Sequence, residues 1–318
     1  MLILNILLLI AGFIVLIKCA DIFVDSASDI AAHFNLSKMF IGLTIVAFGT
    51  SAPELAVSIK SIVSGSGDIV LGNVVGSNIL NILLILGISA IIHPLTVKNN
   101  TVKKEIPITL LITTLLVVLL SDNLFEKNSI NTLTRGDGIA ILLFFMIFIY
   151  YLMGQMRKRK DNEKAIPKHG LLLSTIFTVI GIIGIIVGSN FVVDSASAIA
   201  LHLGVSEKMI ALTVVALGTS LPELVTSIVA TRKGSYDIAI GNVVGSNIFN
   251  VGVVIGIPIS IFGGFSGYQI NMVDLSAMLI ATILLLFCSF TEYKIDKKEG
   301  FLFLLTFIIY YSYVLFMQ

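Results

Sequence analysis

Leu43-Thr-Ile-Val-Ala-Phe-Gly-Thr-Ser-Ala-Pro-Glu54 places a carboxylate inside an apolar stretch, and Leu212-Thr-Val-Val-Ala-Leu-Gly-Thr-Ser-Leu-Pro-Glu223 repeats it 169 residues later. These two glutamates are expected to be the only carboxylates deep inside apolar segments. A carboxylate at bilayer depth costs at least about 2.5–3.5 kcal/mol, and neither copy has a Lys or Arg at matching depth. The motif therefore predicts a membrane protein that takes up cations.

The composition independently indicates a membrane protein. Of 318 residues, 57% are hydrophobic and 12% are charged, whereas a soluble domain has roughly 25% charged residues. We therefore expect membrane lipid around the chain. The net charge of +1 gives no reason to expect nucleic acid as a partner.

We expect an all-α membrane protein with ten transmembrane helices in two inverted-topology repeats of five, since a span needs about 20 apolar residues. The expected spans lie near residues 2–20, 37–61, 69–92, 105–121 and 137–154, and then near 170–193, 206–231, 238–262, 271–290 and 299–317. The predicted units are 1–154, a basic linker at 155–169, and 170–318. Asp25 and Asp194 are expected in the loops that follow the first and sixth spans.

The two halves repeat without a gap. Residues 42–58 match 211–227 at 11 of 17 positions, and 68–81 match 237–250 at 11 of 14. Because each unit has an odd number of spans, the second copy must enter the membrane in the opposite orientation. Inverted repeats are common in transporters, whose ion sites lie near the midplane between the repeats.

Basic residues predict the orientation. With ten spans, 16 Lys and Arg residues fall nearest to the loops after spans 1, 3, 5, 7 and 9, and four fall on the other side. Short loops rich in Lys and Arg stay in the cytoplasm. We therefore expect an inner or plasma membrane protein with both termini outside and the linker that holds Arg157-Lys-Arg-Lys160 in the cytoplasm.

Each copy of the first motif combines oxygen-bearing side chains with a proline. The spacing of Thr50, Ser51 and Glu54 puts their oxygens on one helix face. Pro53, like Pro222 in the second copy, lacks the N–H that would bind the carbonyl four residues earlier, so nearby backbone oxygens need another partner. Both copies thus offer side-chain and main-chain oxygens to an ion.

A second motif is also duplicated, as Gly72-Asn-Val-Val-Gly-Ser-Asn-Ile-Leu-Asn81 and Gly241-Asn-Val-Val-Gly-Ser-Asn-Ile-Phe-Asn250. Asn73, Ser77 and Asn81 recur every four residues and form a polar stripe on an apolar helix. The glycines allow close helix packing, but packing does not explain the stripe. The combined donor set contains oxygen without His or Cys, which suits Ca²⁺ and Na⁺ and argues against Zn²⁺ or Cu.

These paired motifs resemble the two alpha repeats of the calcium/cation antiporter superfamily, close to its sodium/calcium exchanger branch. The resemblance covers nearly the whole chain and implies a prokaryotic inner-membrane exchanger of inorganic cations that transports Ca²⁺ and Na⁺, needs no cofactor and functions as a monomer. It implies that the first and sixth helices slide across a fixed core. The implied ion ligands are Glu54, Glu223, Thr50, Thr219, Ser51, Ser220, Ser77 and Ser246, with the carbonyls of Ala47 and Ala216; the polar stripe adds Asn81 and Asn250.

One position departs from the family pattern. Many exchangers of this branch carry an Asp at the position of Asn250, and the potassium-dependent subgroup uses that Asp. Because Asn81 and Asn250 are both neutral here, we expect no requirement for K⁺.

Charge balance favours Na⁺/Ca²⁺ exchange. Two carboxylates neutralise one Ca²⁺. If three Na⁺ enter for each Ca²⁺ that leaves, one net positive charge moves inward per cycle. An inside-negative membrane potential favours this movement by about 2.3 kcal/mol per 100 mV. The main alternative is Ca²⁺/H⁺ exchange, in which the glutamates trade protons for the metal. The inverted repeat argues against a channel, the short linker against a receptor, and the lack of a nucleophile–base pair or phosphate loop in the sequence against an enzyme.

The predicted orientation can be tested by thiol labelling. A cysteine introduced between Arg157 and Lys160 should resist an impermeant reagent in intact cells and react after lysis, because this loop faces the cytoplasm. A cysteine next to residue 1 should show the opposite behaviour. Labelling of the linker in intact cells would contradict both the charge count and the inverted repeat.

Overall fold

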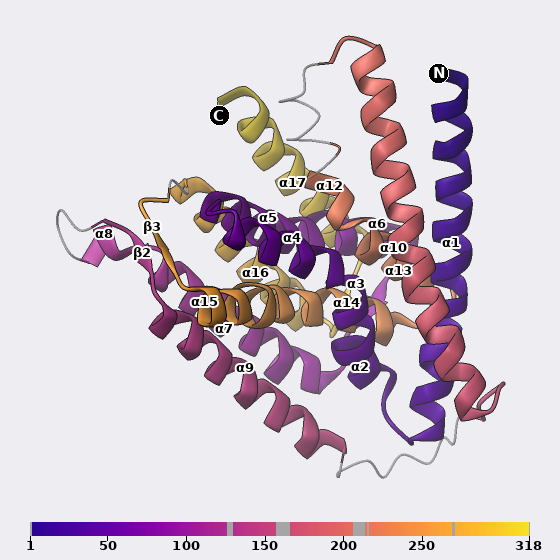
Figure 1. Cartoon of the computed structure of the whole chain (residues 1–318). Helices are drawn as coiled ribbons and strands as arrows, with labels where there is room; N and C mark the ends of the chain where they lie inside the picture. The colour runs from indigo at the N-terminus through magenta and orange to yellow at the C-terminus, as the bar shows by residue number, and fades with distance from the viewer. Residues whose placement is uncertain are drawn as a thin grey trace.

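The computed structural model describes residues 2–125, 130–156, 166–205, 214, 216–268 and 271–317, and nearly all of its regular structure is helical (Figure 1). Some predictions lie outside the described residues. These are the start of the span expected from residue 206, most of the linker, and the basic residues Lys127, Arg157 to Lys160, Lys164 and Lys208.

The first half of the chain contains the helices α1 Leu2–His33, α2 Lys38–Ile41, α3 Ala47–Thr50, α4 Ala52–Val63, α5 Gly67–Leu80, α6 Gly87–Ile92, α7 Ile106–Leu119, α8 Asp122–Phe125 and α9 Arg135–Met156. Its π-helical segments are η1 Gly42–Val46, η2 Asn81–Leu86 and η3 Thr101–Glu105. The second half contains α10 Leu171–His202, α12 Ala216–Thr219, α13 Leu221–Arg232, α14 Tyr236–Phe249, η5 Asn250–Ile255, α15 Gly256–Phe262, α16 Met272–Phe290 and α17 Lys297–Met317. Two short antiparallel pairs join β1 Leu95–Thr96 to β4 Lys294–Ile295 and β2 Thr132–Leu133 to β3 Phe265–Ser266.

The prediction of an all-α membrane protein is confirmed. Among the described residues, seven helical stretches are long and apolar enough to cross a membrane, or eight if the bent pair 38–50 and 52–63 counts as one span. Most predicted boundaries lie within a few residues of a helix end.

The expected lengths of the first and sixth spans are wrong. α1 continues to His33 and α10 to His202, so Asp25 and Asp194 lie within helices and not in loops. Hydropathy marks where the apolar residues end, but the backbone hydrogen bonds of a helix can continue through the polar residues that follow. In α1 the exposed carboxylate of Asp25 is paired with Lys233, at 2.8 Å.

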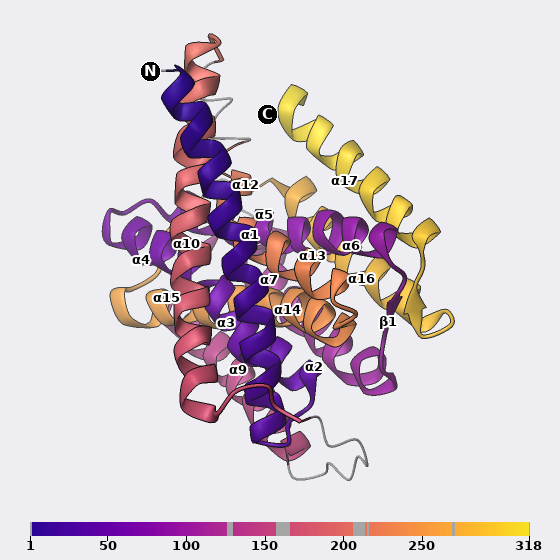
Figure 2. The ribbon, with the colours of Figure 1, turned by 90° about the vertical axis from the view of Figure 1, so that its right-hand side faces the viewer.

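α1 and α10 form a pair of long helices that run side by side along one flank of the molecule (Figure 2). His33, at the end of α1, contacts the carbonyl of His169, just before α10 begins, so the helices are antiparallel. Small residues bring their backbones together: a Cβ built at Gly188 would lie 2.8 Å from the backbone nitrogen of Leu16. This is the small-residue packing expected between helices in lipid.

α5 and α14, the two helices that carry the second motif, lie in the centre of the molecule. In α14, every residue from Ile238 to Phe249 is buried. Polar side chains on this helix therefore need partners inside the protein. The fold thus buries the α14 copy of the second motif completely, whereas in the α5 copy Gly72 is exposed and Asn73 and Gly76 are half-buried.

α14 also packs very closely against η1 and α3. A Cβ built at Gly245 would lie 2.7 Å from the Cβ of Ala47 and 2.9 Å from the Cα of Leu43. A side chain at position 245 therefore cannot fit unless these elements shift.

Gly245→Ala is expected to lower the temperature of thermal unfolding, because overpacking a close contact typically costs about 1–3 kcal/mol. Gly154→Ala is the control and should retain or gain stability, because Gly154 is an exposed glycine within α9 and Ala favours a helix over Gly by about 1 kcal/mol. Thermal unfolding of both purified variants in detergent measures the difference. Equal losses of stability would contradict the close packing of Gly245.

Candidate functional site

Both glutamates of the first motif stand where a helix restarts after a break. α3 ends at Thr50 and α4 begins at Ala52, with a bend of 46° between the two arms. α13 likewise begins at Leu221, and only Ser220 separates it from the short helix α12, which ends at Thr219. Each proline occupies the first turn of its new helix, where a missing N–H costs little. The carboxylates thus lie at helix N-termini, which favour negative charge.

Glu54 and Glu223 are completely buried, and serine hydroxyls surround them. The Oε1 of Glu54 accepts a hydrogen bond from Ser77, at 3.4 Å. The Oε1 of Glu223 accepts from Ser51 at 3.1 Å and from Ser246 at 3.5 Å. Ser51 belongs to the first half, so it joins the carboxylate of the second half to the first motif.

Thr50 makes a further link between the halves. Its Oγ1 lies 2.9 Å from the Oδ1 of Asn242 and 3.4 Å from the hydroxyl of Ser246. The carbonyl of Ala47 lies beside the same serine, whose hydroxyl donates to it at 3.5 Å. This carbonyl also accepts from the backbone nitrogen of Ser51 at 3.0 Å. It is therefore not freed by the proline as expected.

The second copy of the motif makes the related contacts. Thr219 donates to the Oδ1 of Asn73 at 3.4 Å, and Ser220 donates to the hydroxyl of Ser77 at 3.2 Å. Ala216 is the first residue of α12. The predicted threonine and serine ligands of the two copies are therefore brought together into one polar group.

Asn73 and Asn242 were not predicted as site residues, although they hold the glutamates in place. Asn73 donates from Nδ2 to the carbonyl of Glu54 at 3.3 Å. Asn242 donates in the same way to the carbonyl of Glu223 at 3.2 Å. Both residues belong to the polar stripe, whose four-residue spacing in the sequence could have identified them as site residues.

η5, which begins at Asn250, packs against α4, and η2, which begins at Asn81, packs against α13. Four buried oxygens on these elements have no hydrogen-bond partner in the described part of the chain. They are Oε2 of Glu54, Oε2 of Glu223, Oδ1 of Asn81 and Oδ1 of Asn250. Leaving a buried acceptor without a partner costs about 1–3 kcal/mol. All four are hard oxygen donors, and the ion pairs among the described residues include neither glutamate. The arrangement suits a hard cation such as Ca²⁺ or Na⁺.

Two further carboxylates are buried in the protein, although neither lies deep inside an apolar segment of the sequence. Asp29 is 5% exposed and accepts from the backbone nitrogens of Lys168 and His169. Glu105 is 3% exposed and accepts from the hydroxyl of Tyr151. The partners are distant in the sequence, so local spacing could not reveal these contacts.

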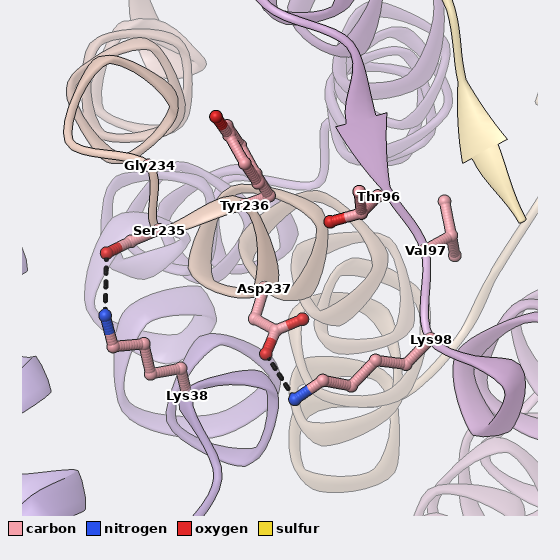
Figure 3. Close-up of a pocket in the computed structure, with 8 residues that line it drawn as sticks. All are labelled: Lys38, Thr96, Val97, Lys98, Gly234, Ser235, Tyr236 and Asp237. Carbon is pink, nitrogen blue, oxygen red and sulfur yellow. Dashed lines mark hydrogen bonds and ion pairs between the residues drawn. The ribbon is translucent and has the colours of Figure 1, made fainter. Parts of the chain in front are cut away.

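A surface cavity of about 230 Å³ lies apart from the glutamates, beside the start of α14 (Figure 3). The ammonium of Lys98 lies 2.5 Å from the carboxylate of Asp237, and Lys38 donates to the hydroxyl of Ser235 at 3.1 Å. Two ammonium groups and one carboxylate leave the lining net positive. This cavity therefore does not suit a cation.

A family model described as sodium/calcium exchanger protein matches residues 4–154 and 173–316. The chain is 37% identical to the putative antiporter CaxA of Alkalimonas amylolytica over 96% of each chain. It is 32% identical to the sodium/calcium exchanger MaX1 of Methanosarcina acetivorans over 98% of each chain.

Among solved structures, the sodium-calcium exchanger NCX_Mj soaked with Na⁺ and without Ca²⁺ is similar over the whole of both chains, with a TM-score of 0.83 and 34% identity. The relatives with named activities are exchangers and antiporters, which are transporters and not enzymes.

Proposed function

We propose that this chain, which belongs to the sodium/calcium exchanger protein family, is a secondary active antiporter that exchanges Na⁺ for Ca²⁺ by alternating access. One observation carries the proposal: two carboxylate and two amide oxygens are buried without partners in one site. Ca²⁺ takes six to eight oxygen ligands in flexible geometry. Glu54 and Glu223 supply the charge of −2 that balances one Ca²⁺.

Glu54 and Glu223 are the proposed central ligands. The remaining proposed ligands of Ca²⁺ and of flanking Na⁺ are Thr50, Thr219, Ser51, Ser220, Ser77, Ser246, Asn81 and Asn250, with the carbonyls of Ala47 and Ala216. The hydrogen bonds of the threonines, the serines and the carbonyl of Ala47 support their assignment, because each of these groups lies within one or two contacts of a glutamate. Neutral hydroxyls, amides and carbonyls suit monovalent ions, since they supply dipoles without further charge.

The proposed topology has ten spans in two inverted repeats, 1–154 and 170–318, with the linker 155–169 in the cytoplasm and both termini outside. Two helical stretches add to the eight: η3 with α7, which covers Thr101–Leu119, and α12 with α13, which covers Ala216–Arg232. The protein is proposed to act as a monomer, because one chain supplies both carboxylates.

The α1–α10 pair is the proposed moving element. Most of α1 faces away from the core, and Lys233 holds its carboxyl-terminal half in place through ion pairs of 2.8 Å with Asp21 and Asp25. Such exposed pairs are weak, typically about 0–1 kcal/mol. They can therefore break and re-form as the helices slide.

Glu54→Gln and Glu223→Gln should each abolish Ca²⁺ transport by a folded protein. Removing one buried charge from a matched set costs about 2–5 kcal/mol, which weakens binding at least about 30-fold. Ca²⁺ flux in proteoliposomes, together with Ca²⁺ binding by the purified variants, measures the effect.

Glu105→Gln is the matched control for these two variants. It makes the same isosteric change at a buried glutamate whose partner is Tyr151 and not the site. Its Ca²⁺ flux should stay close to that of the wild type. Near-normal Ca²⁺ transport by Glu54→Gln or Glu223→Gln would refute the assignment of the ligands.

Transport is expected to be driven by Na⁺, to be electrogenic and not to need K⁺. If three Na⁺ replace one Ca²⁺, one charge crosses per cycle, and 100 mV shifts the equilibrium about 50-fold. Neutral Asn81 and Asn250 provide no third charge to hold K⁺. Ca²⁺ efflux from proteoliposomes at clamped potentials, with and without K⁺, tests all three points.

The outcomes of this flux experiment separate the mechanisms. Flux driven by a proton gradient without Na⁺ would establish Ca²⁺/H⁺ exchange instead. Flux driven by Na⁺ but insensitive to voltage would support Na⁺ and Ca²⁺ as the transported ions and would contradict an exchange of three Na⁺ for one Ca²⁺.

A further inference from the structure

Four asparagines form a circuit of hydrogen bonds where α5 and η2 meet α14 and η5. They are Asn78, Asn81, Asn247 and Asn250, and each is at most 1% exposed. We propose that Asn78 and Asn247 are positioning residues that turn the amide oxygens of Asn250 and Asn81 toward the bound cation. This inference rests on the proposed function and extends it to two residues outside the proposed ligand set.

The circuit begins at two main-chain carbonyls. Asn78 donates from Nδ2 to the carbonyl of Asn247 at 3.3 Å, and Asn247 donates from Nδ2 to the carbonyl of Asn78 at 3.2 Å. A carbonyl can only accept, so the nitrogen of each side-chain amide must face it. This contact fixes which way each amide points, and its oxygen must face the other side.

Each carbonyl is held in turn by its own helix. The carbonyl of Asn78 also accepts from the backbone nitrogen of Asn81, and the carbonyl of Asn247 accepts from that of Asn250. Both lone pairs of each carbonyl are therefore used. The π-helical segments η2 and η5 begin at Asn81 and Asn250, and such segments are frequent at functional sites.

The side-chain oxygens of the first pair then orient the second pair. Asn250 donates from Nδ2 to the Oδ1 of Asn78 at 3.0 Å, and Asn81 donates from Nδ2 to the Oδ1 of Asn247 at 3.0 Å. With their nitrogens engaged, Asn81 and Asn250 present Oδ1 to the remaining side, and these are the two buried amide oxygens without partners. Without the circuit, an amide could turn its NH₂ group toward the cation and repel it.

The pairing is crosswise between the halves. Asn78 of the first half orients Asn250 of the second, and Asn247 orients Asn81. A general packing role for Asn78 would give no reason for it to act through Asn250. The crosswise pattern therefore predicts which pairs of substitutions should be coupled in Ca²⁺ binding.

A double-mutant cycle on Ca²⁺ binding tests the inference. Asn78→Ala and Asn250→Ala should each weaken Ca²⁺ binding by the full-length protein in Na⁺-free detergent about tenfold, the effect of one buried hydrogen-bonding group. The double variant should also lose only about tenfold, because Asn78 acts through Asn250. Asn78→Ala with Asn81→Ala should lose about a hundredfold, since independent effects multiply. Isothermal titration calorimetry with CaCl₂ measures each value.

The mirror cycle serves as an independent repeat. Asn247→Ala should be non-additive with Asn81→Ala and additive with Asn250→Ala. Size-exclusion chromatography and thermal unfolding confirm that each variant is folded; Asn78→Ser and Asn247→Ser replace any alanine variant that is not. Additive losses in the crosswise pairs, or unchanged Ca²⁺ affinity in folded variants with lower melting temperatures, would overturn the positioning role. Absence of Ca²⁺ binding by the wild type would overturn the proposed function as well.

Discussion

Two carboxylates without a basic partner, buried in the centre of a membrane protein, impose the constraint on which the rest of this structure depends. Glu54 and Glu223 are fully buried, and the ion pairs of the described residues do not include them. The surrounding chain stabilises them with dipoles: helix N-termini produced by the proline breaks, and hydroxyls and amides from neighbouring helices. Because these groups are neutral, the charge of the site is set by the two glutamates alone.

The partners of the two glutamates come from both halves of the chain. Ser51 of the first half donates to Glu223, and Ser220 of the second half donates to Ser77, which itself donates to Glu54. A displacement of one half relative to the other would therefore change the surroundings of both carboxylates together. Shared contacts of this kind couple the two copies of the motif into one site.

Sequence reasoning succeeded where the determining contacts are local. The two prolines predicted where backbone hydrogen bonds are lost, and the helices break just before them. The apolar stretches predicted most of the spans. It failed where the partner is distant: Asp25 lies within a helix beside Lys233, and Glu105 is buried against Tyr151. Asn78 lies off the four-residue stripe, and its partner Asn247 is 169 residues away, so periodicity alone could not give it a role.

The asparagine circuit also limits how much charge this site can hold. An ionised Asp at position 250 would have no N–H to donate to the Oδ1 of Asn78, and two oxygens would face each other across about 3.0 Å. Asn78 could not turn its nitrogen toward such an Asp without losing its bond to the carbonyl of Asn247. The amide at position 250 and the amide at position 78 are thus matched to each other. The neutral stripe follows from this hydrogen-bond pattern, and it keeps the charge available to the cations at −2.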